Sequence, residues 1–172
     1  LRQAGYYCTN RSKTDYNFAG NDKAIWDECS GKAHYRKRRE GQPFFCVFNF
    51  TASHESSLFK KNKPKGNPSI APKDIIVPPY LPDLPEIRSD LAHYHDIMKR
   101  LDDQVGRVLD ELRRDGLAED TVIFYYSDHG GILPRGKRYL KDTGSKIPMI
   151  VHFPEKWRHL SPFKPGSAPD EP

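Results

Sequence analysis

The residues best suited to chemistry form one short turn, Ser127-Asp128-His129-Gly130-Gly131. A carboxylate and an imidazole side by side on a glycine-bounded turn can both reach one metal ion, because Asp supplies a hard oxygen and imidazole suits several divalent ions. The structural alternative is a turn whose Asp accepts hydrogen bonds from backbone amides. The pattern therefore indicates a candidate metal site with Asp128 and His129 as ligands.

This turn directly follows an apolar run, residues 121–126, that we expect to be a buried strand. A second apolar run at residues 149–153 predicts another strand. In open α/β sheets, ligands bind beyond the carboxyl ends of the strands. The turn thus follows the carboxyl end of the expected strand at residues 121–126, where a binding site is expected.

The strongest helical signal begins near Asp83, which can cap the first turn, and continues with Pro85 and Glu86 at positions typical of a helix start. Gly116 is expected to end the helix. A coiled-coil seam is the alternative, but a strand follows at once, so we expect a helix packed on a sheet. Its apolar stripe, spaced alternately by four and three residues, consists of Ile87, Leu91, Tyr94, Met98, Leu101, Val105, Val108 and Leu112.

Upstream, Gly5 is expected to end a short helix before a strand at residues 6–9, and a helical piece is expected near residues 22–29. The run FFCVFNF at residues 44–50 predicts a strand buried on both faces. Residues 53–82 form a long irregular passage, which is usually functional or disordered. Together these elements predict an α/β fold, a mostly parallel mixed sheet sandwiched by helices and incomplete as written.

Length and composition exclude several other classes of protein. The 172 residues correspond to about one domain, and 12% aromatic residues are too many for a disordered chain. No apolar run approaches the roughly 18–20 residues of a membrane-spanning helix. Three cysteines exclude a disulfide scaffold and leave at least one thiol without an internal partner.

The net charge of +5 is local, because without two lysine- and arginine-rich segments the chain has 19 basic and 23 acidic residues. These segments are either solvated loops or a surface for an anionic polymer. A non-enzymatic polyanion-binding module is therefore one alternative function. Only Tyr35 and Phe59 accompany the basic residues, so we expect no nucleic-acid partner. The basic residues are Lys32, Arg36, Lys37, Arg38 and Arg39, then Lys60, Lys61, Lys63 and Lys65.

Four segments in order resemble the sulfatase family of the alkaline-phosphatase-like superfamily, over roughly residues 1–155. LRQAGYYCTNRSKTDYN resembles a passage that carries a lysine, here Lys13. FFCVFNFTASHES resembles a strand whose following loop carries a sulfate-contacting histidine, here His54. DGLAEDTVIFYYSDHG resembles the helix end, strand and metal turn. A loop lysine, here Lys137, and IPMIVHFP complete the resemblance.

The resemblance implies an alkaline-phosphatase-like fold and hydrolysis of a sulfate ester on a small molecule or a glycan. It implies that Lys13, His54 and Lys137 are catalytic and contact the sulfate, because cations stabilise developing negative charge and histidine can protonate a leaving oxygen. It implies one divalent ion on Asp128 and His129, Ca²⁺ by resemblance, whereas the imidazole of His129 also admits Mn²⁺ or Zn²⁺. It also implies a periplasmic, secreted or lysosomal protein.

Two positions depart from the family's pattern. The family's lysine is usually followed two residues later by histidine, where this chain has Asp15. The second residue of the metal turn is often asparagine, where this chain has His129. Phosphonate and phosphodiester hydrolases of the same superfamily resemble the chain at this turn. Such a hydrolase is therefore the alternative enzyme.

The family's nucleophile is missing from the sequence. Sulfatases of this kind use a Cys or Ser in C-x-P-x-R or S-x-P-x-R, and none of Cys8, Cys29 and Cys46 has that context. The family places this motif and a metal-binding Asp pair upstream. We therefore expect residues 1–155 to be the central part of a catalytic domain, inactive alone, with residues 156–172 as a proline-rich linker. Cys46 is expected to be a core residue.

Overall fold

The computed structural model describes residues 1–17 and 19–168. It divides into two compact units, Leu1–Thr51 and Ala52–Pro172. Among the described residues, no helix combines the length and the apolar character needed to cross a bilayer.

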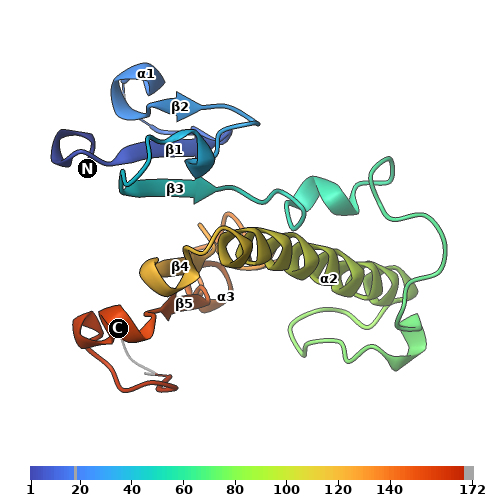
Figure 1. Ribbon diagram of the computed structural model, residues 1–172. Helices are drawn as coiled ribbons and strands as arrows, with labels where there is room; N and C mark the ends of the chain where they lie inside the picture. The colour runs from blue at the N-terminus through green and yellow to red at the C-terminus, as the bar shows by residue number, and fades with distance from the viewer. Residues whose placement is uncertain (18, 169–172) are drawn as a thin grey trace. The chain divides into compact units, whose positions relative to one another are not determined.

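The first unit is built on three parallel strands, with β1 (Tyr7–Arg11) between β2 (Glu28–Cys29) and β3 (Phe44–Phe48) (Figure 1). β1 and β3 pair along their whole length. A 3₁₀ turn, η1 (Arg2–Ala4), precedes β1 and ends at Gly5, whose φ of 87° confirms the expected left-handed cap. Because all three strands are parallel, their carboxyl ends share one edge.

Two expectations for this unit are corrected. The helical piece expected at residues 22–29 is only α1 (Asp22–Ile25), and its last two expected residues form β2 instead. The third strand is not buried on both faces, since Phe45 is 42% exposed. The core lies on the other side of the strand, where Tyr35 of η2 (Tyr35–Lys37) stacks on Phe44 at 4.8 Å between ring centroids.

The second unit contains the long helix α2 (Pro85–Arg114), with Pro85 at its first position as expected. Asp83 does not cap this helix, because Leu84 is the N-cap residue and makes no side-chain cap bond. The Asp83 carboxylate instead accepts two hydrogen bonds from Arg88, at 2.5 and 2.7 Å. Arg88 also donates to the Ile75 carbonyl at 2.7 Å and so ties the preceding segment to the helix.

The apolar stripe of α2 is confirmed at Leu91, Leu101 and Leu112, which are buried. It is wrong at Met98, which is 36% exposed, while its neighbour Ile97 is 1% exposed. Ile75 packs with Leu91 and Ala92 in a core cluster that also includes Val77, Ile87 and Leu133. The helix therefore organises the segments before and after it.

The remaining sheet is a pair of antiparallel strands, β4 (Ile123–Tyr126) and β5 (Met149–His152), joined by a loop that contains α3 (Asp142–Ser145). The burial expected for the first of these strands is wrong, since Phe124 and Tyr126 are exposed. With the parallel sheet of the first unit, the chain has the mixed α/β character that we predicted, but β4 and β5 do not extend a parallel sheet.

Short 3₁₀ turns occupy the connections. The long passage at residues 53–82 contains η3 (Glu55–Leu58) and η4 (Pro72–Asp74). η5 (Ala118–Asp120) precedes β4, and η6 (Glu155–Leu160) lies where we expected linker. Asp120 accepts hydrogen bonds from Lys156 at 2.6 Å and from the Trp157 indole at 3.0 Å, which joins these two turns.

Candidate active site

The turn that carries Asp128 and His129 leaves β4 directly, as the sequence predicted. The Ser127 hydroxyl donates to the His129 carbonyl at 2.6 Å. The Gly130 amide donates to the Gly144 carbonyl at 2.8 Å. These bonds fix the backbone on both sides of the imidazole.

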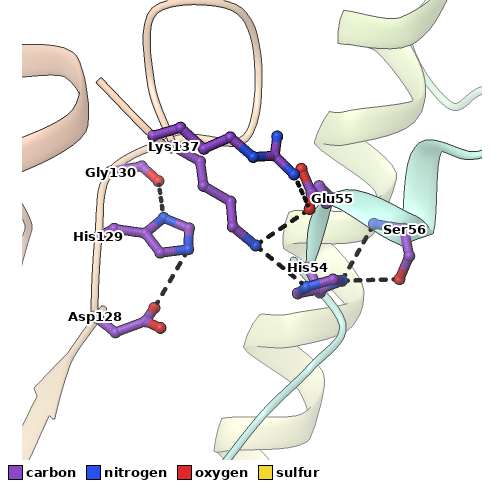
Figure 2. A network of polar contacts seen from close by, with 8 residues as sticks. His54, Glu55, Ser56, Asp128, His129, Gly130 and Lys137 are labelled. Carbon is purple, nitrogen blue, oxygen red and sulfur yellow. Dashed lines mark hydrogen bonds and ion pairs between the residues drawn. The ribbon is translucent and has the colours of Figure 1, made fainter. Parts of the chain in front are cut away.

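The hydrogen bonds of His129 determine which of its ring nitrogens can act as a ligand. Nδ1 lies 2.7 Å from the Gly130 carbonyl oxygen, which can only accept, so Nδ1 carries the proton (Figure 2). Nε2 then has the lone pair, and it lies 3.7 Å from Oδ1 of Asp128. The imidazole is thus held with its unprotonated nitrogen beside a carboxylate oxygen.

These two side chains fit a shared divalent ion. Ligands about 2.0–2.4 Å from one ion lie about 3–4 Å apart, which matches the observed separation. They are only part of a ligand set, because within residues 1–17 and 19–168 no three His, Cys, Asp or Glu side chains gather to hold an ion. One nitrogen and one carboxylate suit Mn²⁺ or Zn²⁺ at least as well as Ca²⁺.

The loop after the turn owes its shape to three glycines. A Cβ on Gly130 would collide with the Thr143 carbonyl, and one on Gly136 would collide with the Gly131 carbonyl. A Cβ on Gly144 would meet the carbonyls of Tyr139 and Gly136. The Lys137 amide also donates to the Gly131 carbonyl at 2.7 Å. The loop is therefore closed on itself, with Lys137 fixed in its backbone.

His54 and Lys137, which are 83 residues apart in the sequence, meet in this unit. Lys137 Nζ lies 3.3 Å from His54 Nε2 and 3.3 Å from Glu55 Oε1 (Figure 2). His54 is the N-cap of η3, where its Nδ1 accepts the Ser56 amide at 3.2 Å and contacts the Ser56 hydroxyl at 2.9 Å. Two residues that the family motifs singled out separately thus form one polar cluster.

Glu55 connects this cluster to a further cation. Its Oε1 accepts from Arg138 at 2.8 Å as well as from Lys137. Burial raises the pKa of Glu55, but the hydrogen bonds from Arg138 and Lys137 outweigh it and leave that pKa below its ordinary value. Sequence analysis missed both Glu55 and Arg138. Their only signal was that each follows a residue the motifs had identified.

Lys13 belongs to the first unit, on the exposed stretch after β1. Its carbonyl accepts a hydrogen bond from Asn10 Nδ2 at 2.7 Å, and Asn49 donates to Asn10 Oδ1 at 2.7 Å. Asn10 is 1% exposed and lies in β1, while Asn49 directly follows β3. Two neighbouring parallel strands therefore hold the backbone that presents Lys13.

Two of the cysteines, Cys8 and Cys46, lie where burial opposes ionisation of the thiol. Burial raises the pKa of Cys8 and of Cys46, which keeps these thiols protonated. The Thr9 hydroxyl also contacts Cys46 Sγ at 2.8 Å, and Cys46 is half-buried in β3. None of the three cysteines forms a disulfide within the described part of the chain.

The two basic segments are partly neutralised by acidic neighbours. Lys37 pairs with Glu28 at 2.5 Å, and Lys63 pairs with Asp90 at 2.8 Å. The guanidinium of Arg38 lies 5.3 Å from the centre of the Phe44 ring. At least these three cations are engaged inside their own unit.

Comparison with known proteins identifies the class. The sequence model of the Sulfatase family matches residues 3–169, nearly the whole chain. The chain therefore belongs to the sulfatase family, which confirms the resemblance drawn from its ordered motifs. Family membership counts against the alternative of a binding module that is unrelated to an enzyme.

Its relatives include sulfatases from bacteria and animals. It is 42% identical to an ulvan-active sulfatase of Formosa agariphila, over 91% of this chain and 32% of that protein. It is 31% identical to the steryl-sulfatase of Mus musculus, over 91% of this chain and 23% of that protein. It is 38% identical to the N-sulphoglucosamine sulphohydrolase of Homo sapiens, over 52% of this chain and 18% of that protein. The chain thus spans a third or less of these curated relatives.

Proposed function

We propose that the complete protein carrying this sequence hydrolyses a sulfate ester, with water converting the ester to an alcohol and sulfate. The observation that carries the proposal is the meeting of His54 with Lys137, two residues matched to the sulfatase motifs. The named relatives are sulfatases or a sulphohydrolase, which favours sulfate over the phosphodiester alternative.

The hydrogen bonds around His54 suggest how an anion is held. Because Nδ1 accepts the Ser56 amide, the ring proton stands on Nε2. Nε2–H and the Lys137 ammonium are then two donors facing each other at 3.3 Å, and neither can accept from the other. An oxyanion placed beside both would accept from each. We therefore propose that a sulfate oxygen accepts hydrogen bonds from both His54 and Lys137.

The same donors serve the reaction. As the bond between sulfur and the leaving oxygen breaks, negative charge grows on that oxygen, and a fixed cation such as Lys137 stabilises it. The Nε2 proton of His54 is available to the leaving oxygen, which then departs as the alcohol. Lys13 is proposed as a further cation for the sulfate, on the strength of the motif alone.

One divalent ion completes the proposed site. Asp128 and His129 would hold it, and a bound ion of this kind polarises sulfate oxygens as a Lewis acid. The resemblance favours Ca²⁺, and the imidazole ligand favours Mn²⁺ or Zn²⁺. The nucleophile is proposed to lie outside this chain, since none of Cys8, Cys29 and Cys46 has the required motif.

The proposed substrate is a sulfated glycan. One relative is named as a sulfatase active on ulvan, and another as a sulphohydrolase of N-sulphoglucosamine, a sugar with a sulfo group on nitrogen. The basic residues of the chain would favour approach of a polyanion.

Substitution of Lys137 tests this function in the complete protein. We expect Lys137→Met to lower kcat/KM for an aryl sulfate about a hundredfold, because removing one donor to developing charge costs about 3 kcal/mol. Lys141→Met is the matched control, since Lys141 is an exposed lysine of the same loop, and it should change kcat/KM less than about twofold. A wild-type enzyme that prefers an aryl phosphodiester to the aryl sulfate would refute the proposal, as would equal activity in both variants.

A further inference from the structure

The cluster around Glu55 contains two cationic side chains, Lys137 and Arg138, but only one carboxylate, so it has one surplus positive charge. Oε1 of Glu55 accepts from Lys137 at 3.3 Å and from Arg138 at 2.8 Å, so one carboxylate serves two cations. The Glu55 side chain is 18% exposed, whereas that of Arg138 is 68% exposed. A surplus cation at the solvent side of the proposed sulfate site is suited to a second anion.

The backbone of Arg138 is unusual and explains how it reaches Glu55. Its φ is 75°, in the left-handed region that residues other than glycine rarely adopt. Side chains of successive residues in an extended chain point to opposite sides. The left-handed turn instead lets Lys137 and Arg138 approach the same carboxylate. Such conformations persist where surrounding structure holds them, and they cluster at ligand sites.

The guanidinium retains capacity for a ligand. Its bond to Glu55 uses Nη2, one nitrogen of a planar group with five donors. Arginine can therefore keep this bond and hold another oxyanion along a second edge. Since both cations contact Oε1, the Arg138 Nη2 and Lys137 Nζ atoms lie within about 6 Å of each other, the sum of the two contacts. One sugar unit bearing two anionic groups can span that distance.

We propose that Arg138 binds a second anionic group of the substrate, a sulfate ester or a carboxylate, beside the sulfate held by His54 and Lys137. The proposal rests on the proposed function and makes Arg138 a determinant of specificity for polyanionic substrates. Glu55 then has a positioning role, because it orients both cations without contacting the substrate.

The test compares three substrates in the complete protein: an aryl sulfate with one anionic group, a disulfated disaccharide, and a monosulfated disaccharide with a uronate carboxylate. We expect Arg138→Ala to lower kcat/KM at least about tenfold, mainly through KM, on one or both disaccharides, and less than about twofold on the aryl sulfate. The disaccharide that loses more identifies the second group as sulfate or carboxylate.

Arg135 provides the matched control, because it lies in the same loop, is exposed and also has a left-handed backbone, with φ 71°. Arg135→Ala should leave all three substrates within about twofold of wild type. An equal fall on all three with Arg138→Ala would show that Arg138 only positions Lys137, and no fall on any would show no contact. Either result overturns the proposal.

Equilibrium binding of the disulfated disaccharide separates this proposal from the proposed function. If the wild-type enzyme hydrolyses none of the three substrates, the sulfatase function fails. The affinity of wild type and Arg138→Ala for the disaccharide then decides the second subsite alone. A tenfold weaker affinity in the variant supports it, and equal affinities overturn it.

Discussion

At the residue scale, the two proposed metal ligands, Asp128 and His129, differ in how they are held. His129 is fixed by its hydrogen bond to the Gly130 carbonyl, which leaves the lone pair of the ring on Nε2. The Asp128 side chain is 63% exposed and supplies the only negative charge of the pair. The fixed imidazole thus determines from which side a proposed cation would bind, and the carboxylate supplies the electrostatic attraction.

Asp128→Ala in the complete protein should lower kcat/KM at least about a hundredfold and reduce bound metal, because the variant loses the anionic ligand. A loss of about 3 kcal/mol of stabilisation corresponds to such a factor. Steady-state kinetics measures the first effect, and elemental analysis of the dialysed protein measures the second. Near-normal activity with full metal content would show that the turn is purely structural.

The companion variant His129→Asn identifies the kind of ion. If the ion is Ca²⁺, the amide oxygen should be tolerated or should improve its use, because Ca²⁺ prefers oxygen ligands. If the ion is Zn²⁺ or Mn²⁺, loss of the imidazole should weaken binding. The residual metal content of this variant, compared with that of Asp128→Ala, distinguishes the two.

Single motifs predicted part of this site, and the fold supplied the rest. Asp128, His129, His54 and Lys137 each stand in a short segment whose neighbours identify it. The pairing of Glu55 with Arg138 joins positions 83 residues apart. No local spacing reports such a contact, because it depends on how the loop after β4 folds back within the second unit.

At the element scale, the loop between β4 and β5 is shaped by backbone packing. Gly130, Gly136 and Gly144 each face a carbonyl so closely that no side chain fits. Gly131 lies among them with nothing near its Cβ position. Glycine is therefore required at three of these four positions for steric reasons, and a methyl group there would move the backbone that carries Lys137.

We accordingly expect Gly144→Ala to lower kcat/KM more than tenfold, because displacement of Lys137 by even about 1 Å is costly in a positioned site. Gly131→Ala should remain within about twofold of wild type, since its Cβ enters open space. Kinetics on the aryl sulfate, with circular dichroism to verify folding, provides the comparison. Equal activities would mean that the loop adapts without moving Lys137.

The elements themselves were predictable to different degrees. The 3.6-residue period fixed the existence and approximate ends of α2, and Pro85 marked its start. The expected cap at Asp83 is wrong because its carboxylate accepts hydrogen bonds from the Arg88 side chain and not from the helix amides. Periodicity placed Met98 on the apolar stripe, whereas the structure buries its neighbour Ile97. The antiparallel pairing of β4 with β5 is not encoded in the composition of either strand.

At the scale of the whole molecule, acidic and basic groups tie distant segments together and make stability depend on pH. Glu55, Asp83, Asp96 and Asp120 each have a lowered pKa. Hydrogen bonds from neighbouring donors lower it in every case, and for Glu55 they overcome the larger opposing effect of burial. A carboxylate with a lowered folded pKa stabilises the protein above its unfolded pKa, and that contribution is lost as the pH falls through the folded value. Acid should therefore loosen many contacts together, below about pH 4.

His93 adds a second loss at milder pH. It is 8% exposed on α2, and its Nδ1 has no hydrogen-bond partner among the described residues. Burial lowers its pKa, Lys63 lowers it further, and Asp96 and Asp90 oppose them. The folded state thus favours neutral His93, while the unfolded chain binds a proton near pH 6.5. The contribution of neutral His93 to the free energy of unfolding should be fully present above that pH. It should decline as the pH falls below it, by at most about 1.4 kcal/mol per pH unit for one proton.

His93→Gln should therefore flatten the decline in the free energy of unfolding between about pH 7 and pH 5, and it should leave the steeper loss below about pH 4 unchanged. Glutamine keeps a polar side chain of similar length without the titration. His95→Gln is the control for loss of an imidazole, because His95 is exposed on the same helix. Denaturant titrations of the complete protein at each pH measure these curves. Parallel curves for wild type and His93→Gln would show that another group governs the milder transition, since only a residue titrating differently in the folded and unfolded states can change the slope.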